Sequence, residues 1–179
     1  MIGTLTWLPA LDRPDLLAEP VAAALAGAGP DAALVAEIDP TLADTAAFCA
    51  TYEVPLDVSA NCVVLAARRA GTVSRAACVV LATTRADVNR RARHELGARK
   101  ASFAAVDDAM AATGMEYGGI TPVGLPADWP VLVDAAVAAA DRVVVGSGLR
   151  RSKLLLPGAA VASLPGARVV EGLGLPAAG

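Results

Sequence analysis

Hydrophobic and polar positions along the chain follow two periods, one typical of helices and one typical of strands. A helix is predicted at residues 14–28, where it is entered through DRPDLLAEP and ended by GAGP at 27–30. AALVAEI (32–38) is typical of a strand, and a short helix is expected at Thr41–Tyr52 after Asp39-Pro40. Two β-rich runs, 61–69 and 72–83, flank Ala70-Gly71, and this arrangement predicts a β-hairpin.

The second half of the chain continues the alternation. Thr84–Asp87 has the form of a capping box and opens a helix with Val88, Ala92 and Leu96 on one face, which ends at Gly97. We expect a further helix at Val106–Thr113, a short one at 157–164, and strands at 130–137, 142–148, 152–157 and 167–173. The pattern predicts one mixed α/β domain at 31–179, on which an N-terminal helical extension (1–30) packs.

Composition narrows the class of protein. Of the 179 residues, 55% are hydrophobic and 18% are charged, which excludes wholesale disorder. The apolar runs VAAALAGAG and DAAVAAAD fall short of the roughly 20 residues of a membrane span, and the first residues lack the pattern of a signal peptide. Cys49, Cys62 and Cys78 are an odd number without CxxC spacing, so we expect reduced, buried thiols. These features predict a cytoplasmic protein without a membrane partner.

Charge is distributed unevenly within a net charge of -3. Residues 68–100 hold nine basic side chains against Asp87 and Glu95, a local charge of +7. A second basic group, Arg150, Arg151 and Lys153, lies near the C-terminus. Such clusters are either a solvated helix surface or a binding surface for phosphates, and the sequence leaves both interpretations open.

The sequence offers none of the familiar catalytic motifs. His94 is the only histidine and lies among arginines, so we interpret it as a surface residue rather than a member of a triad. No cluster of ligands has metal-site spacing, and we expect neither a metal nor a cofactor. Gly146-Ser147-Gly148 begins like a dinucleotide loop, but Arg151 stands where the third glycine belongs, and Lys153 is not preceded by the glycine of a phosphate-binding loop.

The stretch GGITP (Gly118–Pro122) requires an irregular backbone. Gly118 and Gly119 can adopt conformations closed to other residues, and Pro122 fixes the exit from the loop. A loop of this kind is either a tight bend between strands or a site that presents bare N–H groups to a carbonyl oxygen or a phosphate.

Three segments in this order, 50–68, 97–126 and 142–173, resemble the YbaK/prolyl-tRNA-editing family of aminoacyl-tRNA deacylases. The first resembles the family's short helix, small loop and first long strand. The second is similar to its helix followed by the GxxxP loop, here Gly118 to Pro122. The third resembles its closing segment, in which a small glycine loop, Gly146-Ser147-Gly148, leads into a strand, a short helix and a terminal strand.

The resemblance implies a compact, barrel-like mixed β-sheet surrounded by helices, and a trans-acting enzyme that hydrolyses the ester of mischarged tRNA. Its implied catalytic groups include the amides of Gly118 and Gly119. The substrate would be bound by Ile120, Thr121, Pro122, Gly146, Ser147 and Gly148. Aminoacyl-tRNA is the expected partner, contacted by Arg90, Arg91, Arg93, Arg150, Arg151 and Lys153.

One position departs from the family pattern. The first long strand of the characterised deacylases begins with a lysine in a pattern like AKTL, whereas the matching letters here are Ala60-Asn61-Cys62-Val63. Asn61 can donate and accept hydrogen bonds but carries no charge. Two outcomes are open. In the first, the protein is a deacylase in which Asn61 acts as a catalytic polar group beside the GxxxP loop, helped by Arg150, Arg151 or Lys153. In the second, it is a catalytically weak or inactive binding module for an aminoacyl-tRNA end or a nucleotide-like ligand. Cys62 is expected to point to the opposite face of the strand, into the core.

Overall fold

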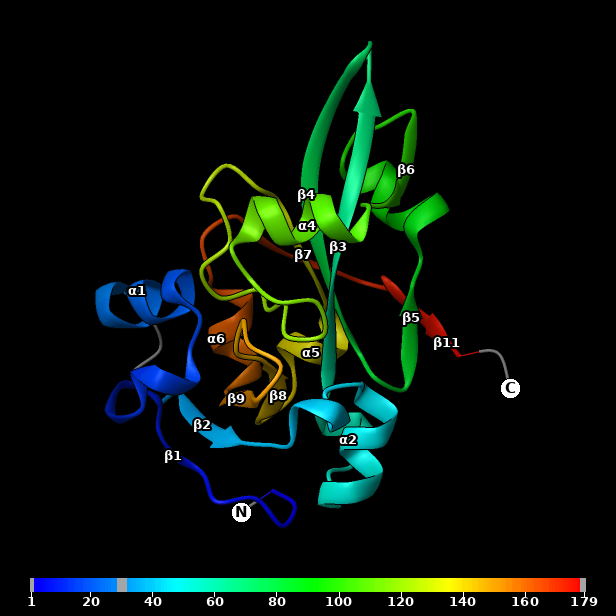
Figure 1. The fold of residues 1–179 in the computed structure, drawn as a ribbon. Helices are drawn as coiled ribbons and strands as arrows, with labels where there is room; N and C mark the ends of the chain where they lie inside the picture. Colours follow the sequence, from blue (N-terminus) through cyan, green and yellow to red (C-terminus); the bar gives the residue numbers. More distant parts are fainter. Residues whose placement is uncertain (1, 29–31, 178–179) are drawn as a thin grey trace.

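The strands of the described residues, 2–28 and 32–177, form two larger sheets and a small ribbon (Figure 1). In this computed structural model the first sheet is antiparallel throughout, in the order β1 (Leu8–Pro9), β2 (Leu34–Glu37), β9 (Ser152–Leu156) and β8 (Val143–Gly146). The second sheet has the order β10 (Ala167–Val170), β7 (Val131–Asp134), β4 (Thr72–Leu81), β3 (Ala60–Arg69) and β6 (Lys100–Phe103), with β10, β7 and β4 parallel. The ribbon pairs β5 (Thr84–Ala86) with β11 (Gly174–Pro176).

Six α-helices lie around these sheets in the part of the chain that the structure describes: α1 (Glu19–Ala28), α2 (Thr45–Tyr52), α3 (Arg93–Glu95), α4 (Val106–Thr113), α5 (Ala135–Ala138) and α6 (Gly158–Ala162). A π-type turn at Val88–Ala92 precedes α3, and 3₁₀ turns lie at Ala10–Asp12, Pro14–Leu16, Pro40–Leu42 and Leu56–Val58. The mixed α/β class is confirmed. The described strands form separate sheets rather than one closed barrel, and a bridge between Ser59 and Val144 joins the two larger sheets where β3 begins.

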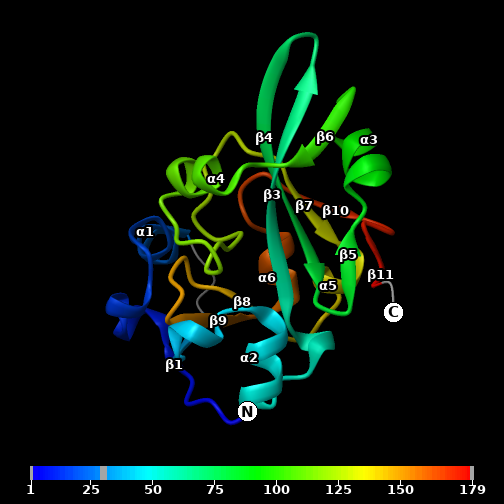
Figure 2. The same ribbon diagram turned by 45° about the vertical axis from the view of Figure 1, so that its right-hand side comes forward.

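The predicted hairpin is confirmed as β3 and β4, which pair from Ala60–Leu81 to Arg69–Thr72. Ala70 and Gly71 form its two-residue turn, both with positive φ (48° and 82°), as the tight turns that match the twist of a hairpin require. The distal part of the hairpin projects beyond the rest of the fold (Figure 2). Its proximal part, where β3 begins, lies next to α2 and β8.

Several predicted boundaries are wrong, because backbone contacts and side-chain caps set where the elements begin and end. The helix predicted at 14–28 begins only at Glu19, because Leu17 is extended and the Ala18 amide donates to the carbonyl of Ser147. The stop signal predicted at 27–30 falls partly on residues 29–31, outside the described residues. The helix predicted from Thr41 begins at Thr45, where Asp44 accepts hydrogen bonds from the Ala46 and Ala47 amides.

The capping box and one strand also need correction. Thr84 belongs to β5 and donates its hydroxyl to the Leu81 carbonyl, while Asp87 caps the following turn by accepting from the Arg90 amide. The strand predicted at 130–137 ends at Asp134, whose carboxylate accepts from the Ala136 amide and starts α5. The strands predicted at 142–148 and 167–173 end earlier, at Gly146 and Val170.

The main core lies between the two larger sheets. Valines of β2, β4, β7 and β8 pack there with Leu154 and Leu156 of β9, and Val21 and Leu25 of α1 cover one side. A second cluster buries Phe48 and Cys49 of α2 against the other face of the first sheet. None of the described helices is long and apolar enough to cross a membrane.

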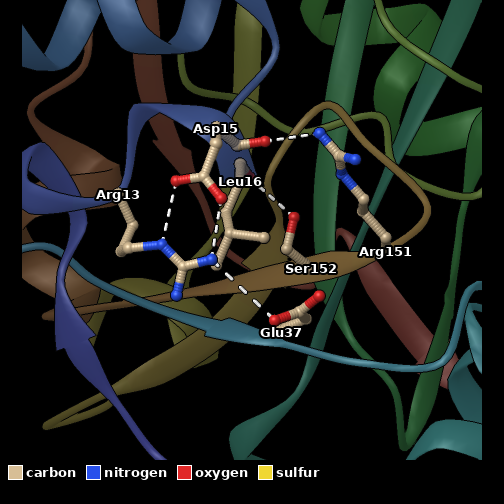
Figure 3. A network of polar contacts seen from close by, with 6 residues as sticks. All are labelled: Arg13, Asp15, Leu16, Glu37, Arg151 and Ser152. Atoms are coloured by element: carbon tan, nitrogen blue, oxygen red, sulfur yellow. Dashed lines mark hydrogen bonds and ion pairs between the residues drawn. The ribbon is translucent and has the colours of Figure 1, made fainter.

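Polar contacts join the N-terminal segment to the beginning of β9 (Figure 3). Arg13 forms an ion pair with Asp15 at 2.7 Å and lies 3.8 Å from Glu37. Arg151 donates to the Asp15 carbonyl at 2.6 Å, and the Ser152 hydroxyl donates to the Leu16 carbonyl at 2.6 Å. The segment before α1 is therefore bound to the loop between β8 and β9. The division between extension and domain, expected at 30/31, lies outside the described residues.

Candidate active site

A cavity of about 670 Å³ opens where β3 begins, at the junction of the two larger sheets. Its walls come from the first residues of β3, the end of β8, the turn before α2, the β5 strand, and the loops around residues 104 and 118. Of the residues that the sequence singled out, Asn61, Gly118, Ile120, Gly146, Arg150 and Lys153 line this cavity. Residues up to 110 positions apart along the chain therefore meet at one place.

The GxxxP loop and the loop after β8 pack backbone against backbone. The Gly119 carbonyl accepts from the Gly148 amide at 2.7 Å, and the Gly119 amide donates to the Glu116 carbonyl at 2.9 Å. A Cβ atom on Gly119 would lie 2.5 Å from the Leu149 carbonyl carbon, and one on Gly146 would collide with the Gly119 carbonyl oxygen. These glycines are therefore required by the close approach of the two loops to each other.

Gly118 and Ile120 are the members of the GxxxP loop that line the cavity. Gly118 has φ 84°, a conformation that favours glycine. Among the described residues, the amides of Gly118 and Ile120 donate no hydrogen bond within the protein, whereas the Gly119 amide is already bound to Glu116. The two bare donors that the loop can offer to a ligand are therefore those of Gly118 and Ile120.

The remaining residues of the two loops lie behind the cavity wall. Thr121 and Pro122 are buried, and the Thr121 hydroxyl has no hydrogen-bond partner among the described residues. Ser147 is fully buried, and its hydroxyl contacts the Ser152 hydroxyl at 2.7 Å. Gly148 packs against the N-terminal segment, where a Cβ would collide with the side chain of Ala18. These residues support the loops from inside the fold.

Asn61 lies half-buried in the cavity wall near the start of α2. Its side-chain oxygen accepts a hydrogen bond from the Thr45 hydroxyl at 2.6 Å, which leaves the side-chain N–H groups without a partner among the described residues. Side chains alternate along a strand, and Cys62, the next residue, packs on the main core, against which Ile120 of the GxxxP loop also packs. The bond to Thr45 holds Asn61 beside the start of α2, in the wall of the same cavity that Gly118 and Ile120 line.

The three basic residues near the C-terminus have different surroundings. Arg150 donates to the carbonyls of Tyr117 at 3.0 Å and Pro40 at 3.1 Å, so its guanidinium joins the GxxxP loop to the turn before α2. Arg151 is exposed and bound to the Asp15 carbonyl. Lys153 is only 7% exposed and donates to the Ala43 carbonyl at 2.9 Å. Burial lowers the pKa of the Lys153 ammonium to about 8.

The arginines of the π-type turn and of α3 lie at the surface. Arg90 and Arg93 are exposed, and the Arg93 guanidinium donates to the Asn89 carbonyl at 2.8 Å. Arg91 is half-buried and lies 3.5 Å from Glu95. Arg85, which comes just before this segment in β5, lines the cavity. Arg85 therefore lies in the cavity wall, and the exposed Arg90 and Arg93 follow it along the chain.

The cysteines and the histidine do not have the surroundings of catalytic groups. Burial raises the pKa of the Cys62 thiol well above its ordinary value and that of Cys78 to about 12, which disfavours a reactive thiolate. The His94 side chain is 81% exposed, on the surface as predicted. Within residues 2–28 and 32–177, no group of three or more His, Cys, Asp or Glu side chains is arranged to hold a metal ion.

Sequence reasoning missed several residues of the cavity. Thr45, Phe103, Val106 and Tyr117 line it, and the last three are among the exposed large hydrophobic residues. Thr45 follows the helix cap Asp44, and no signal in the sequence connects it with Asn61. Phe103 and Tyr117 are two of only six aromatic residues other than histidine in the chain, and the place of Tyr117 directly before Gly118-Gly119 was the available signal.

Comparison with known proteins adds the family context. The family model for the aminoacyl-tRNA editing domain matches residues 39–164. A search of curated proteins finds no match. The fold is similar to that of a proposed trans-editing enzyme for prolyl-tRNA synthetase, with a TM-score of 0.74 and 19% identity over 86% of this chain and 94% of the other.

Two further solved structures have the same fold. One comes from work on epitope backbone grafting onto scaffold proteins, with a TM-score of 0.73 and 20% identity over 86% of this chain and 95% of the other. The other is a hypothetical protein, with a TM-score of 0.69 and 19% identity over 79% of this chain and 90% of the other. At these identities the structural likeness concerns the fold.

Proposed function

Because the chain belongs to the family of aminoacyl-tRNA editing domains, which the family model matches over residues 39–164, we propose that it is a trans-acting deacylase. It hydrolyses the ester of mischarged tRNA in the cavity at the start of β3. Its partner is aminoacyl-tRNA, and its place of action is the cytoplasm. The similarity to a proposed trans-editing enzyme favours action on tRNA that has already been released by a synthetase.

The observation that carries this proposal is the pair of bare amides at the cavity wall. The amides of Gly118 and Ile120 have no acceptor among the described residues, and both residues line the cavity. Donors that are fixed before the reaction and aimed at a developing negative charge stabilise the transition state of acyl transfer. An ester carbonyl placed against this loop would be polarised by them.

The reaction then needs only water. The water oxygen attacks the ester carbonyl carbon and forms a tetrahedral intermediate, whose oxyanion accepts hydrogen bonds from the two amides. The bond between that carbon and the ribose oxygen breaks, and the proton that the water loses on attack passes to the ribose oxygen. The products are the free amino acid and a tRNA with a free terminal hydroxyl. The uncommitted N–H groups of Asn61 are suited to orient the water or the ribose hydroxyls.

A second function is favoured by Asn61 itself. Where the family pattern has a lysine, this chain has an uncharged side chain that is already bound to Thr45. A cavity of the same shape without turnover would act as a binding module for an aminoacyl-tRNA end or a nucleotide-like ligand.

A panel assay separates the two functions. Purified protein is incubated with tRNAs that carry radiolabelled, mismatched amino acids, and the label that remains on the tRNA is followed against the uncatalysed rate. A deacylase accelerates the loss of at least one amino acid. Tight binding of a non-hydrolysable aminoacyl-adenosine without acceleration on any tRNA would identify the binding module instead.

A further inference from the structure

Lys153 occupies a position in β9 where the fold otherwise places apolar side chains. The next three residues, Leu154–Leu156, are all buried, and β9 lies between β2 and β8 inside the first sheet. Lysine is almost never buried unless its charge is paired. Yet among the described residues no carboxylate oxygen lies within 4.0 Å of the Lys153 ammonium, although the side chain is only 7% exposed.

The ammonium is held in place but retains unused donors. It donates to the Ala43 carbonyl at 2.9 Å and lies 5.1 Å from the centre of the Phe48 ring, a distance at which a cation is attracted by the ring. A lysine ammonium has three N–H donors, and Ala43 is its one hydrogen-bond partner in the described part of the chain. Lys153 also lines the cavity, together with Asn61 and Gly146.

The two neighbouring arginines differ from Lys153, since neither is buried and the guanidinium group of each donates to backbone carbonyls of the fold. Arg150 is bound to the Tyr117 and Pro40 carbonyls, and Arg151 is bound to the Asp15 carbonyl on the outside. Arg85 lines the cavity from β5, but its side chain is exposed. Lys153 is therefore the buried cation of the cavity among the described residues.

We propose that Lys153 is the substrate-binding cation of the cavity, and that its ammonium binds an anionic oxygen of the substrate. That oxygen belongs either to the phosphate of the terminal nucleotide or to the oxyanion formed during hydrolysis. This inference rests on the proposed deacylase function. It supplies from β9 the positive charge that Asn61 does not supply from β3.

Neighbouring groups set the charge of Lys153. Burial lowers its pKa to about 8, Cys49 and Asp44 favour the charged form, and Arg150 disfavours it. With a pKa near 8, about nine-tenths of the side chain is charged at pH 7. Binding or catalysis that needs the ammonium therefore declines as the pH rises through about 8.

The test compares Lys153→Met, which keeps the length of the side chain without its charge, with Lys153→Arg, which keeps the charge. Arg142 lies outside both the cavity lining and the basic segment 68–100, and Arg142→Met is the control. For each folded variant, kcat and KM are measured on the mischarged tRNA that the wild-type protein hydrolyses, and binding of adenosine 5′-monophosphate is measured by calorimetry. A hydrogen bond to a charged group predicts a loss of about 10-fold or more in kcat/KM for Lys153→Met, and no loss is expected for Arg142→Met.

The kinetic constants and the binding measurement together identify which anionic oxygen Lys153 binds. A raised KM with weaker binding of adenosine 5′-monophosphate identifies the phosphate as the ligand, whereas a lowered kcat with unchanged binding identifies the oxyanion. The rate above the uncatalysed background should fall above pH 8 in the wild-type protein, and Lys153→Arg should move this fall to higher pH. These pH profiles decide the question if Lys153→Met does not fold.

An active wild-type protein whose kcat, KM and pH profile are matched by Lys153→Met would overturn the inference but not the proposed function. A wild-type protein without hydrolysis would overturn the proposed function, and equal binding of adenosine 5′-monophosphate by both proteins would then overturn the inference too.

Discussion

At the scale of single residues, Asn61 is the position where a substitution is most informative. Its oxygen is bound to the Thr45 hydroxyl at 2.6 Å, and its N–H groups border the cavity. Asn61→Ala leaves the Thr45 hydroxyl without this partner, and we expect it to weaken binding of a non-hydrolysable aminoacyl-adenosine by about 1–3 kcal/mol. Calorimetric titration of both proteins measures the difference.

Asn61→Lys is the sharper variant, because it introduces the charge that the sequence resemblance predicts at this position. A deacylase adapted to asparagine should lose activity, since a second cation would lie in a cavity that already contains Lys153. A gain of deacylation by Asn61→Lys would contradict this expectation and favour the binding module.

Burial of Lys153 also predicts how stability depends on pH. The folded pKa of about 8 lies below the ordinary 10.5, so between these values the unfolded chain binds more protons and the free energy of unfolding rises with pH. The shift corresponds to about 3 kcal/mol. We expect the difference in free energy of unfolding, Lys153→Met minus wild type, to decrease by about this amount between pH 7 and pH 10.5, as measured by urea unfolding. A difference that stays constant over this range would show that Lys153 is not held in a desolvating site.

The three basic residues near the C-terminus also show what the sequence can and cannot predict at this scale. The sequence groups Arg150, Arg151 and Lys153 as one tRNA-binding cluster, but in the structure their contacts differ. Arg150 donates to the Tyr117 carbonyl, Arg151 donates to the Asp15 carbonyl of the N-terminal segment, and Lys153 is buried in the cavity wall. The run of leucines that follows Lys153 is typical of a strand buried on both faces, which is a signal that the lysine lies inside. The bond of Asn61 to Thr45 has no such signal, because it depends on how α2 packs against β3.

At the scale of elements, the GxxxP loop depends on its contact with the loop after β8. A Cβ on Gly119 would lie 2.5 Å from the backbone of Leu149, which cannot move away as a side chain tip could. We therefore expect Gly119→Val, and already Gly119→Ala, to displace the loop, to lower the free energy of unfolding by about 1–3 kcal/mol and to abolish deacylation. Gly27→Ala in α1 is the control, because a Cβ there has no atom within 4 Å and alanine favours a helix. Urea unfolding measures the stability and the deacylation assay measures the activity. A Gly119→Ala protein of unchanged stability would contradict the close contact between Gly119 and the Leu149 backbone.

The sequence predicted most elements but not their ends. The hairpin followed from two β-rich runs around Ala70-Gly71, since its pattern and turn are local. The strands β5, β6 and β11 were missed because they are short and lack the run of valines or leucines that marks β7 and β8. The alanine-rich residues after Asp134 continue a strand-like pattern in the sequence. They form α5 instead, because the Asp134 carboxylate caps the start of this helix.

At the scale of the whole molecule, basic side chains are found both in the cavity wall and on the surface of the protein. The net charge is -3, but residues 68–100 carry a local +7. Arg85 lines the cavity, and the exposed Arg90 and Arg93 follow it along the chain. A tRNA whose terminal nucleotide enters the cavity would have its acceptor stem near this segment, so we interpret the segment as the surface that binds the tRNA backbone.

Salt dependence tests that interpretation. Neutralising phosphates releases counterions, so the affinity for tRNA should fall steeply as the salt concentration rises. Arg90→Ala with Arg93→Ala should weaken binding and reduce the slope of log K against log salt by about one for each phosphate that is no longer neutralised. Arg91 is best left unchanged, because it lies 3.5 Å from Glu95 and is half-buried. Arg142→Ala, outside the basic segment, serves as the control and should keep the full slope. Filter-binding titrations between low and physiological salt give the slopes. A double variant that retains the wild-type slope would show that these arginines belong to an ordinary solvated helix surface and do not bind tRNA.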